Sequence, residues 1–280
     1  MPLRDHLAMA RAVYGRNRGL APKAVPADRR TPPPLDYPYG EAGAGPPLVL
    51  VHGMVDQQET WRFNRDALAE HFRVISLDLP GCNHMPRRGE ATLEGSADFL
   101  GEFVDALRLD RFLLLGMSLG SWVVLEYAAR HPARVAGAAL AGLPLARPTE
   151  GGRRLGRLIA EHKHRAPLQA FVAAAKGSRP YAHFVMSAVT HASNPHLAFN
   201  ASLLANGQSS SDALTWLDNF QSMLEVDAEA LLARLARTGV PYAAIFGDRD
   251  GQVGLDRIAQ IDALAGHVIL VPNARHCVHI

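Results

Sequence analysis

One short segment in the middle of the chain restricts the fold more than any other feature. The apolar run Leu113–Leu115 leads directly into the pentapeptide 116–120, which reads Gly-Met-Ser-Leu-Gly, and helical spacing follows it. A strand that turns sharply into a helix leaves no room for a side chain two residues before or after the serine. The turn pushes Ser118 out above the sheet edge, at a helix N-terminus where backbone N–H groups are free. The segment therefore predicts a strand-turn-helix unit that exposes Ser118.

Short apolar runs alternate with stretches of helical spacing on both sides of this unit. The runs are bounded by residues that break strands, as is typical of buried strands in a parallel sheet. The expected strands are 48–51, 74–77, 111–115, 135–140, 242–246 and 267–271, with an edge strand near 36–40, and the expected helices are 61–71, 93–107 and 119–130. This alternation predicts an α/β fold with a mostly parallel, doubly wound sheet. Right-handed crossovers place the C-terminal ends of the parallel strands on one rim, where ligands bind in such sheets.

The alternation is interrupted between the strands expected at 135–140 and 242–246. Residues 144–238 are mainly helical in pattern, with Gly, Pro and Ser breaks. Helices inserted between two strands of one sheet would lie over its C-terminal rim. We therefore expect a helical cap at 144–238 and a core made of 35–143 and 239–280. Residues 1–34 are expected to form an N-terminal helix and a linker rich in Pro, Ala and Gly.

The bulk composition excludes several classes of protein. The 280 residues carry a formal net charge of +2, which gives no reason to expect a nucleic-acid partner. Two cysteines are too few for a disulfide framework or a zinc cage, so no metal site is expected. The sequence shows neither a secretory signal nor an apolar run near the roughly 20 residues that span a bilayer. We expect a cytoplasmic protein without stable membrane insertion that acts on a small molecule; the oligomeric state stays open, a homodimer included.

A lone serine is a poor nucleophile and needs a base, which in turn needs a carboxylate partner. The chain has 13 histidines, so position must decide among them. His276 follows the last expected strand at a suitable loop distance, and we prefer it to its competitor His279. Two aspartates follow the fifth core strand; Asp250 lies far enough beyond the turn to curl back towards His276, whereas Asp248 is expected to hold the turn or pair with a neighbour. The chain order Ser118, Asp250, His276 is the order expected for such a sheet.

A tetrahedral intermediate also needs hydrogen-bond donors for its negatively charged oxygen. One is expected to be the N–H of Leu119, directly after the serine. The other is expected to be the N–H of Met54, in the loop after the first core strand, where Gly53 permits a close turn. We interpret His52 of the same loop as a structural histidine that hydrogen-bonds the loop and transfers no proton.

Three further reactive side chains are assigned structural roles. Asp78 follows the second core strand and is expected to shape its loop rather than to act as a catalyst. Cys82 and Cys277 are expected to pack in the interior rather than to act as nucleophiles, although Cys277 adjoins the candidate base in sequence.

Together these motifs resemble the α/β-hydrolase fold superfamily, in its branch with a helical cap. The resemblance runs from about Leu35 to His276, and its motifs are Val51-His52-Gly53, Asp78-Leu79-Pro80-Gly81, Gly116–Gly120, Gly247–Asp250 and His276. It implies an esterase-like or lipase-like serine hydrolase that works without a cofactor. The roles that it implies are nucleophile for Ser118, acid for Asp250, base for His276, and oxyanion donors for Met54 and Leu119. Serine at the turn argues against the haloalkane dehalogenases and epoxide hydrolases, which resemble this chain but use aspartate there.

The chain departs from this pattern around the candidate base and in one loop. Arg275 stands where similar proteins have a small residue before the histidine, and the loop 82–85 reads Cys-Asn-His-Met where they commonly show Gly and Ser. Similar proteins also carry a further helix after the histidine, whereas this sequence ends at Ile280. How His276 is held in place is therefore open.

The first functional hypothesis is hydrolysis of a carboxylic ester of a small, largely apolar substrate through an acyl-enzyme. Acyl transfer and cleavage of an amide or C–C bond by the same residues remain open, as does a non-catalytic binding protein on the hydrolase scaffold. Aromatic and methionine side chains of the cap could line an apolar acyl pocket: Phe171, Phe184, Met186, Phe199, Trp216, Phe220 and Met223. The competing interpretation is that most of these side chains form the core of the cap itself.

Overall fold

The computed structural model describes residues 39–279, apart from residues 146, 177, 191–196, 252, 254–256, 259–260 and 262–266. The helix and linker expected in residues 1–34 lie outside the described residues.

Within the described residues, seven strands form one sheet in the order β1-β3-β2-β4-β5-β6-β7. The strands are β1 (Tyr39–Ala42), β2 (Pro47–Val51), β3 (Arg73–Leu77), β4 (Phe112–Met117), β5 (Val135–Ala141), β6 (Tyr242–Gly247) and β7 (His267–Val271). β1 pairs antiparallel with β3, and every other pair is parallel. The predicted α/β fold with a mostly parallel, doubly wound sheet is confirmed. The expected edge strand starts three residues later than predicted and lies at the edge of the sheet.

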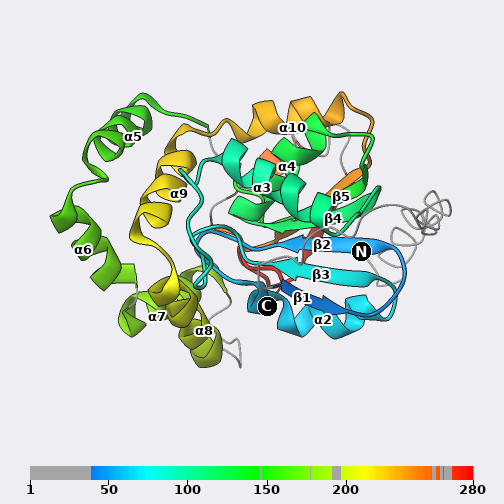
Figure 1. Cartoon of the computed structure of the whole chain (residues 1–280), viewed down its shortest axis with the longest axis horizontal. Helices are drawn as coiled ribbons and strands as arrows, with labels where there is room; N and C mark the ends of the chain where they lie inside the picture. Colours follow the sequence, from blue (N-terminus) through cyan, green and yellow to red (C-terminus); the bar gives the residue numbers. More distant parts are fainter. Residues whose placement is uncertain are drawn as a thin grey trace.

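Helices cover both faces of this sheet. α3 (Leu93–Ala106), α4 (Leu119–Arg130) and α10 (Ala228–Ala236) lie on one face, and α2 (Arg62–Ala69) lies on the other (Figure 1). The helix expected at 61–71 begins as a 3-10 turn, η1 (Gln58–Trp61), before α2. Apolar side chains of each helix layer pack against the sheet in a separate buried cluster.

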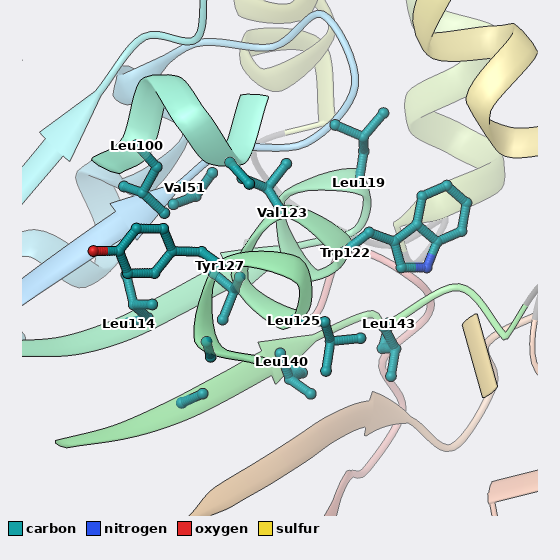
Figure 2. Packing of buried hydrophobic residues seen from close by; sticks show 14 of the residues in the cluster. Val51, Leu100, Leu114, Leu119, Trp122, Val123, Leu125, Tyr127, Leu140 and Leu143 are labelled. Carbon is teal, nitrogen blue, oxygen red and sulfur yellow. The ribbon is translucent and has the colours of Figure 1, made fainter. Parts of the chain in front are cut away.

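α4 is the central helix of the molecule. Every residue from Leu119 to Ala128 is buried, as expected of a helix that is enclosed on all sides. Figure 2 shows Trp122, Val123 and Tyr127 of α4 packed among apolar side chains of the neighbouring strands and of α3. This packing holds the N-terminal end of α4, and the residue before it, in a fixed position at the C-terminal rim.

Five helices lie between β5 and α10 in the chain. They are α5 (Glu150–His162), α6 (Ala166–Lys176), α7 (Arg179–Val189), α8 (Leu197–Ser210) and α9 (Ala213–Glu225), and we call them the inserted helices. They lie beyond the C-terminal ends of the parallel strands (Figure 1). α10 falls within the range expected for the cap, but its apolar residues belong to the main core beside α4. α10 is therefore part of the helical layer on the sheet.

Polar contacts attach the inserted helices to the loops of the rim. The carboxylate of Asp218 in α9 is buried and accepts hydrogen bonds from Lys163 (2.8 Å), from the backbone N–H of Ala91 (2.9 Å) and from Arg87. The backbone N–H of Asp212 donates to the carbonyl of Gly81 at 2.8 Å. These contacts hold α9 against the loop that follows β3. Of the described helices, none is long and apolar enough to cross a membrane.

Candidate active site

The predicted turn between β4 and α4 places Ser118 at the rim with an unusual backbone. Ser118 has φ 52° and ψ −119°, a conformation that residues other than glycine rarely adopt and that is retained where the surrounding structure imposes it. A β-carbon on Gly116 would lie 2.4 Å from the carbonyl oxygen of Gly120, and one on Gly120 would lie 2.3 Å from the carbonyl oxygen of Val51. The prediction that both positions must lack a side chain is confirmed.

A second serine, which the sequence analysis missed, stabilises this turn. The hydroxyl of Ser121 is fully buried and lies 2.9 Å from the carbonyl oxygen of Gly116 and 3.1 Å from that of Ala141. The contact joins the first turn of α4 to the ends of β4 and β5. No sequence pattern indicated this role, because the partners of Ser121 are backbone atoms of two different strands. The small polar residue type was the only signal.

The structure brings together the three side chains that the sequence analysis selected. Nε2 of His276 lies 2.9 Å from the hydroxyl oxygen of Ser118, and Nδ1 of His276 lies 3.1 Å from Oδ2 of Asp250. Asp250 and His276 are buried, at 7% and 5% exposure. A carboxylate at Nδ1 selects the tautomer that donates from Nδ1, so Nε2 is the acceptor for the Ser118 hydroxyl proton.

The competing residues lie elsewhere. Nε2 of His279 is 2.9 Å from the hydroxyl of Thr60, and its ring packs on Trp61 with 4.9 Å between the ring centroids. Burial is the main cause that lowers the pKa of His279 to about 3, with smaller contributions from His276 and a nearby arginine. His279 is therefore neutral at physiological pH. Asp248 is exposed, and its backbone N–H donates to the carbonyl oxygen of Val271 at 3.1 Å.

The segment around His276 is held by the inserted helix α7. The Arg275 guanidinium donates to the carbonyl oxygens of Ser187 at 2.9 Å and Ala188 at 3.4 Å. The backbone N–H of Cys277 donates to the carbonyl of Val189 at 2.8 Å. These are carbonyls of the last turn of a helix, which lack partners within the helix and which a cation satisfies well. Arg275, which departs from the pattern of similar proteins, thus forms part of the support that was left open.

The two expected oxyanion donors lie beside Ser118. Leu119 is the first residue of α4, where a backbone N–H has no acceptor within its own helix. Met54 lines the same cavity as Ser118, and a β-carbon on the adjacent Gly53 would lie 3.5 Å from the β-carbon of Ser118. His52 accepts a hydrogen bond from the backbone N–H of Leu79 at 3.0 Å, and its Nδ1 lies 2.8 Å from the carbonyl of Gly53. The structural role expected for His52 agrees with these contacts.

The remaining reactive side chains also have structural surroundings. The Asp78 carboxylate accepts from the backbone N–H of Gln58 at 2.7 Å and from the Asn83 amide at 3.1 Å, so it shapes the loop after β3. Both cysteines are free thiols. Burial raises the pKa of Cys82 and of Cys277 far above the usual range of a thiol, which makes both poor nucleophiles. Among the described residues, no group of His, Cys, Asp and Glu side chains could hold a metal ion.

Ser118 opens into a cavity of about 220 Å³ between the rim loops and the inserted helices. Of the cap residues expected to line an apolar pocket, Met186, Trp216 and Met223 do so. Phe171 and Phe184 instead point outwards, at 71% and 69% exposure. Phe220 stacks on Trp216 within the inserted helices, and the side chain of Phe199 lies outside the described residues. The expectation was therefore wrong for Phe171 and Phe184, because helical spacing alone does not tell which apolar face turns inward.

The cavity also has a polar part that the sequence analysis missed. Arg62, Asn200, Asp56, Tyr181 and Gln208 contribute to its wall. These residues come from the loop after β2, from α2 and from α7 and α8. No local pattern marks them, because the tertiary fold alone brings these elements together.

Known proteins of similar sequence and structure extend these observations. A family model described as the alpha/beta hydrolase fold matches residues 46–280. A protein of Mycobacterium phage D29 described as a non-heme haloperoxidase is 30% identical over 213 residues, which cover 74% of this chain and 73% of the phage protein. The pimeloyl-[acyl-carrier protein] methyl ester esterase of Aeromonas hydrophila is 41% identical over 93 residues, which are 33% of this chain and 36% of the esterase. Several other curated relatives match over a similarly small share of their own length.

Solved structures share the fold at lower identity. An esterase from Thermogutta terrifontis superposes with a TM-score of 0.68 at 23% identity, covering 86% of each chain. The family model covers nearly all of the described part of the chain, from β2 to the segment that carries His276. With the sheet order, the positive φ of Ser118 and the placement of His276 after the last strand, this match shows that the chain belongs to the α/β hydrolase fold family.

Proposed function

We propose that this protein is a serine hydrolase that cleaves a carboxylic ester of a small substrate. The observation that carries the proposal is the hydrogen-bonded series Asp250, His276 and Ser118, of which His276 and Ser118 line one cavity. A serine hydroxyl within 2.9 Å of an imidazole nitrogen that is itself oriented by a carboxylate is the arrangement used for acyl transfer. The cavity of about 220 Å³ is smaller than most drug-sized binding sites, which favours a small substrate.

In the proposed mechanism His276 acts twice. Its Nε2 takes the proton of Ser118 as the serine oxygen bonds to the acyl carbon and the carbonyl electrons move to the oxygen. His276 then gives this proton to the leaving alkoxide as the C–O bond breaks, which leaves an acyl-enzyme and a free alcohol. Water next loses a proton to His276 and attacks the acyl carbon, and the returned proton restores Ser118 as the carboxylic acid leaves. Asp250 stabilises the imidazolium in both halves.

The backbone N–H groups of Met54 and Leu119 are proposed to bind the oxyanion in each tetrahedral intermediate. Removal of one such donor typically costs about 3–4 kcal/mol of barrier. The N–H of Leu119 starts a helix whose dipole adds to this effect. Met54 lies in the cavity wall and directly follows Gly53, which approaches Ser118, and this position supports its assignment as the second donor.

The name of one relative favours ester cleavage over the other reactions of the same residues. The Aeromonas relative is named as a methyl ester esterase, whereas a relative from Acinetobacter baylyi is named as a (E)-2-((N-methylformamido)methylene)succinate hydrolase. Both match only about a third of this chain, so a panel of esters, amides and vinylogous diketones is the measurement that separates the reactions.

We further propose that the protein is cytoplasmic, since free thiols are typical of reducing compartments. The proposed acyl chemistry needs no cofactor.

The decisive variant is Ser118→Ala. We expect it to lower the turnover of short p-nitrophenyl esters by on the order of a millionfold and to abolish labelling by a fluorophosphonate probe. Ser202→Ala, an exposed serine of α8, is the matched control and is expected to keep both signals. Turnover that survives in Ser118→Ala would refute the proposal. A folded wild-type protein that takes no label would instead favour a non-catalytic binding protein.

A further inference from the structure

A hydrogen-bonding group in the wall of the cavity carries an inference about the substrate. Arg62, the first residue of α2, and Asn200 of α8 both line the cavity that contains Ser118. The guanidinium of Arg62 donates to Oδ1 of Asn200. The pair joins the core to the inserted helices, so a group bound there would be held from both sides of the cavity.

The contact with Arg62 decides how the Asn200 amide is oriented. A guanidinium has only N–H donors, so the amide must turn its oxygen towards Arg62. Its NH₂ group then faces away from Arg62 with two donors. Asn200 is 3% exposed, and its Nδ2 has no hydrogen-bond acceptor among the described residues. Buried amide donors in proteins are nearly always paired, so this NH₂ calls for an acceptor.

The face of α8 that carries Asn200 is directed at the cavity. Asn200, Leu204 and Gln208 follow one another at a spacing of four and all line it. Residues four apart lie on the same side of a helix. The placement of the whole helix therefore directs Asn200 towards the cavity.

Three titratable groups near Arg62 bear on whether an anion can bind there. Glu59 and Asp56 are acidic residues that act on the Arg62 guanidinium. Glu59 forms its own ion pair with Arg65 at 3.1 Å. Burial is the main cause that raises the pKa of Asp56, which disfavours its charged form. His279, also in the cavity wall, is neutral. The guanidinium of Arg62 therefore places a positive charge in the wall of the cavity that contains Ser118.

We propose that the Arg62–Asn200 pair binds a carboxylate of the substrate, so that the protein hydrolyses an ester that carries a second, free carboxylate group. This inference rests on the proposed ester hydrolysis at Ser118 and narrows its substrate class. A carboxylate has two oxygens that can each accept several hydrogen bonds, and it suits a cation beside an amide NH₂. The substrate is then a half-ester of a dicarboxylic acid, in contrast to the largely apolar substrate expected from the sequence.

The test compares substrates that differ only at the end remote from the ester. Monomethyl succinate, monomethyl glutarate and monomethyl adipate supply the carboxylate at three distances. For each, the methyl ester with a terminal primary amide is the neutral polar analogue, and that with a terminal methyl group is the apolar analogue. For at least one chain length we expect kcat/KM of the carboxylate to exceed that of both analogues by roughly tenfold to hundredfold, the usual effect of a hydrogen bond to a charged group.

Asn200→Asp tests the pair with the smallest change of shape. Aspartate can still accept from Arg62, but it replaces the NH₂ donors by an acceptor with negative charge. We expect the ratio of kcat/KM values, carboxylate over apolar analogue, to fall at least tenfold. Asn206→Asp introduces the same charge at an exposed position of α8 and is expected to keep the ratio of the wild type. Arg62→Gln, a second variant, is expected to lower the ratio as well.

Binding measured without turnover separates this inference from the proposed function. Glutarate and adipate are titrated calorimetrically into Ser118→Ala, with and without Asn200→Asp. Binding that Asn200→Asp weakens at least tenfold supports the carboxylate site even if no ester is hydrolysed, a result that would refute only the proposed reaction. If esters are hydrolysed without preference for a carboxylate, or if the amide analogues react equally well, the carboxylate site is refuted and the ester hydrolysis stands.

Discussion

The buried histidine near the C-terminal end of the described chain makes stability depend on pH in a calculable way. The pKa of His279 is lowered to about 3 in the folded state, mainly by burial, against 6.5 for an ordinary histidine. Between these two values the unfolded chain binds a proton that the folded chain does not. The free energy of unfolding then rises with pH, so the contribution of His279 is lost as the pH falls below about 6.5.

The magnitude at pH 5 can be worked out from the unfolded state. This pH lies about 1.5 units below 6.5, so protonation of the unfolded chain at His279 costs the folded protein about 2 kcal/mol relative to pH 8. The result hardly depends on the folded pKa, because pH 5 lies well above it. A domain of ordinary stability would lose a substantial part of its free energy of unfolding in this way.

The perturbation is His279→Gln, which cannot be protonated and whose side-chain amide can still form a hydrogen bond with Thr60. The assay is urea unfolding of both proteins at pH 8 and pH 5. At pH 8 we expect the variant to be less stable, because it loses the ring that packs on Trp61 at 4.9 Å. Between pH 8 and pH 5 the difference should move by about 2 kcal/mol in favour of the variant.

A matched control separates this effect from the other histidines. His164→Gln makes the same replacement at an exposed histidine, and the change between pH 8 and pH 5 in its difference from the wild type is the reference for that of His279→Gln. If the stability difference between His279→Gln and the wild type does not change between pH 8 and pH 5, the assignment of His279 as a buried neutral histidine is wrong.

Two further variants test how His276 is held. Asp250→Asn keeps the shape but removes the charge that stabilises the imidazolium, so kcat for p-nitrophenyl acetate should fall on the order of ten-thousandfold; a fall below tenfold would contradict the role of Asp250. Arg275→Ala removes the hydrogen bonds to the last turn of α7, and a shift of His276 by even about 1 Å can lower kcat roughly a hundredfold. Arg275→Lys should recover part of the loss, and wild-type kcat in Arg275→Ala would show that the backbone contact of Cys277 is sufficient.

Much of the fold could be predicted from the sequence because its signals are local. The strand limits came within a few residues of the structure, since the inner strands β2, β3, β4 and β5 are short apolar runs that are mostly buried. The turn at Ser118 was equally local, because the space for a β-carbon at Gly116 and Gly120 is decided by the adjoining backbone. Ser118, Asp250 and His276 could be placed on one rim because each follows a parallel strand, and parallel strands end on the same rim.

The sequence by itself thus determined the sheet, the turn that exposes Ser118 and the choice of Asp250 and His276 as its partners. Only the tertiary structure decided what supports and surrounds them: the hold of α7 on Arg275, the neutral state of His279, the outward faces of Phe171 and Phe184, and the pairing of Arg62 with Asn200. The physical reason is the range of the interactions. Backbone geometry and hydrophobic periodicity act between neighbours in the chain, whereas burial and hydrogen-bond pairing depend on residues that the fold brings together from distant segments.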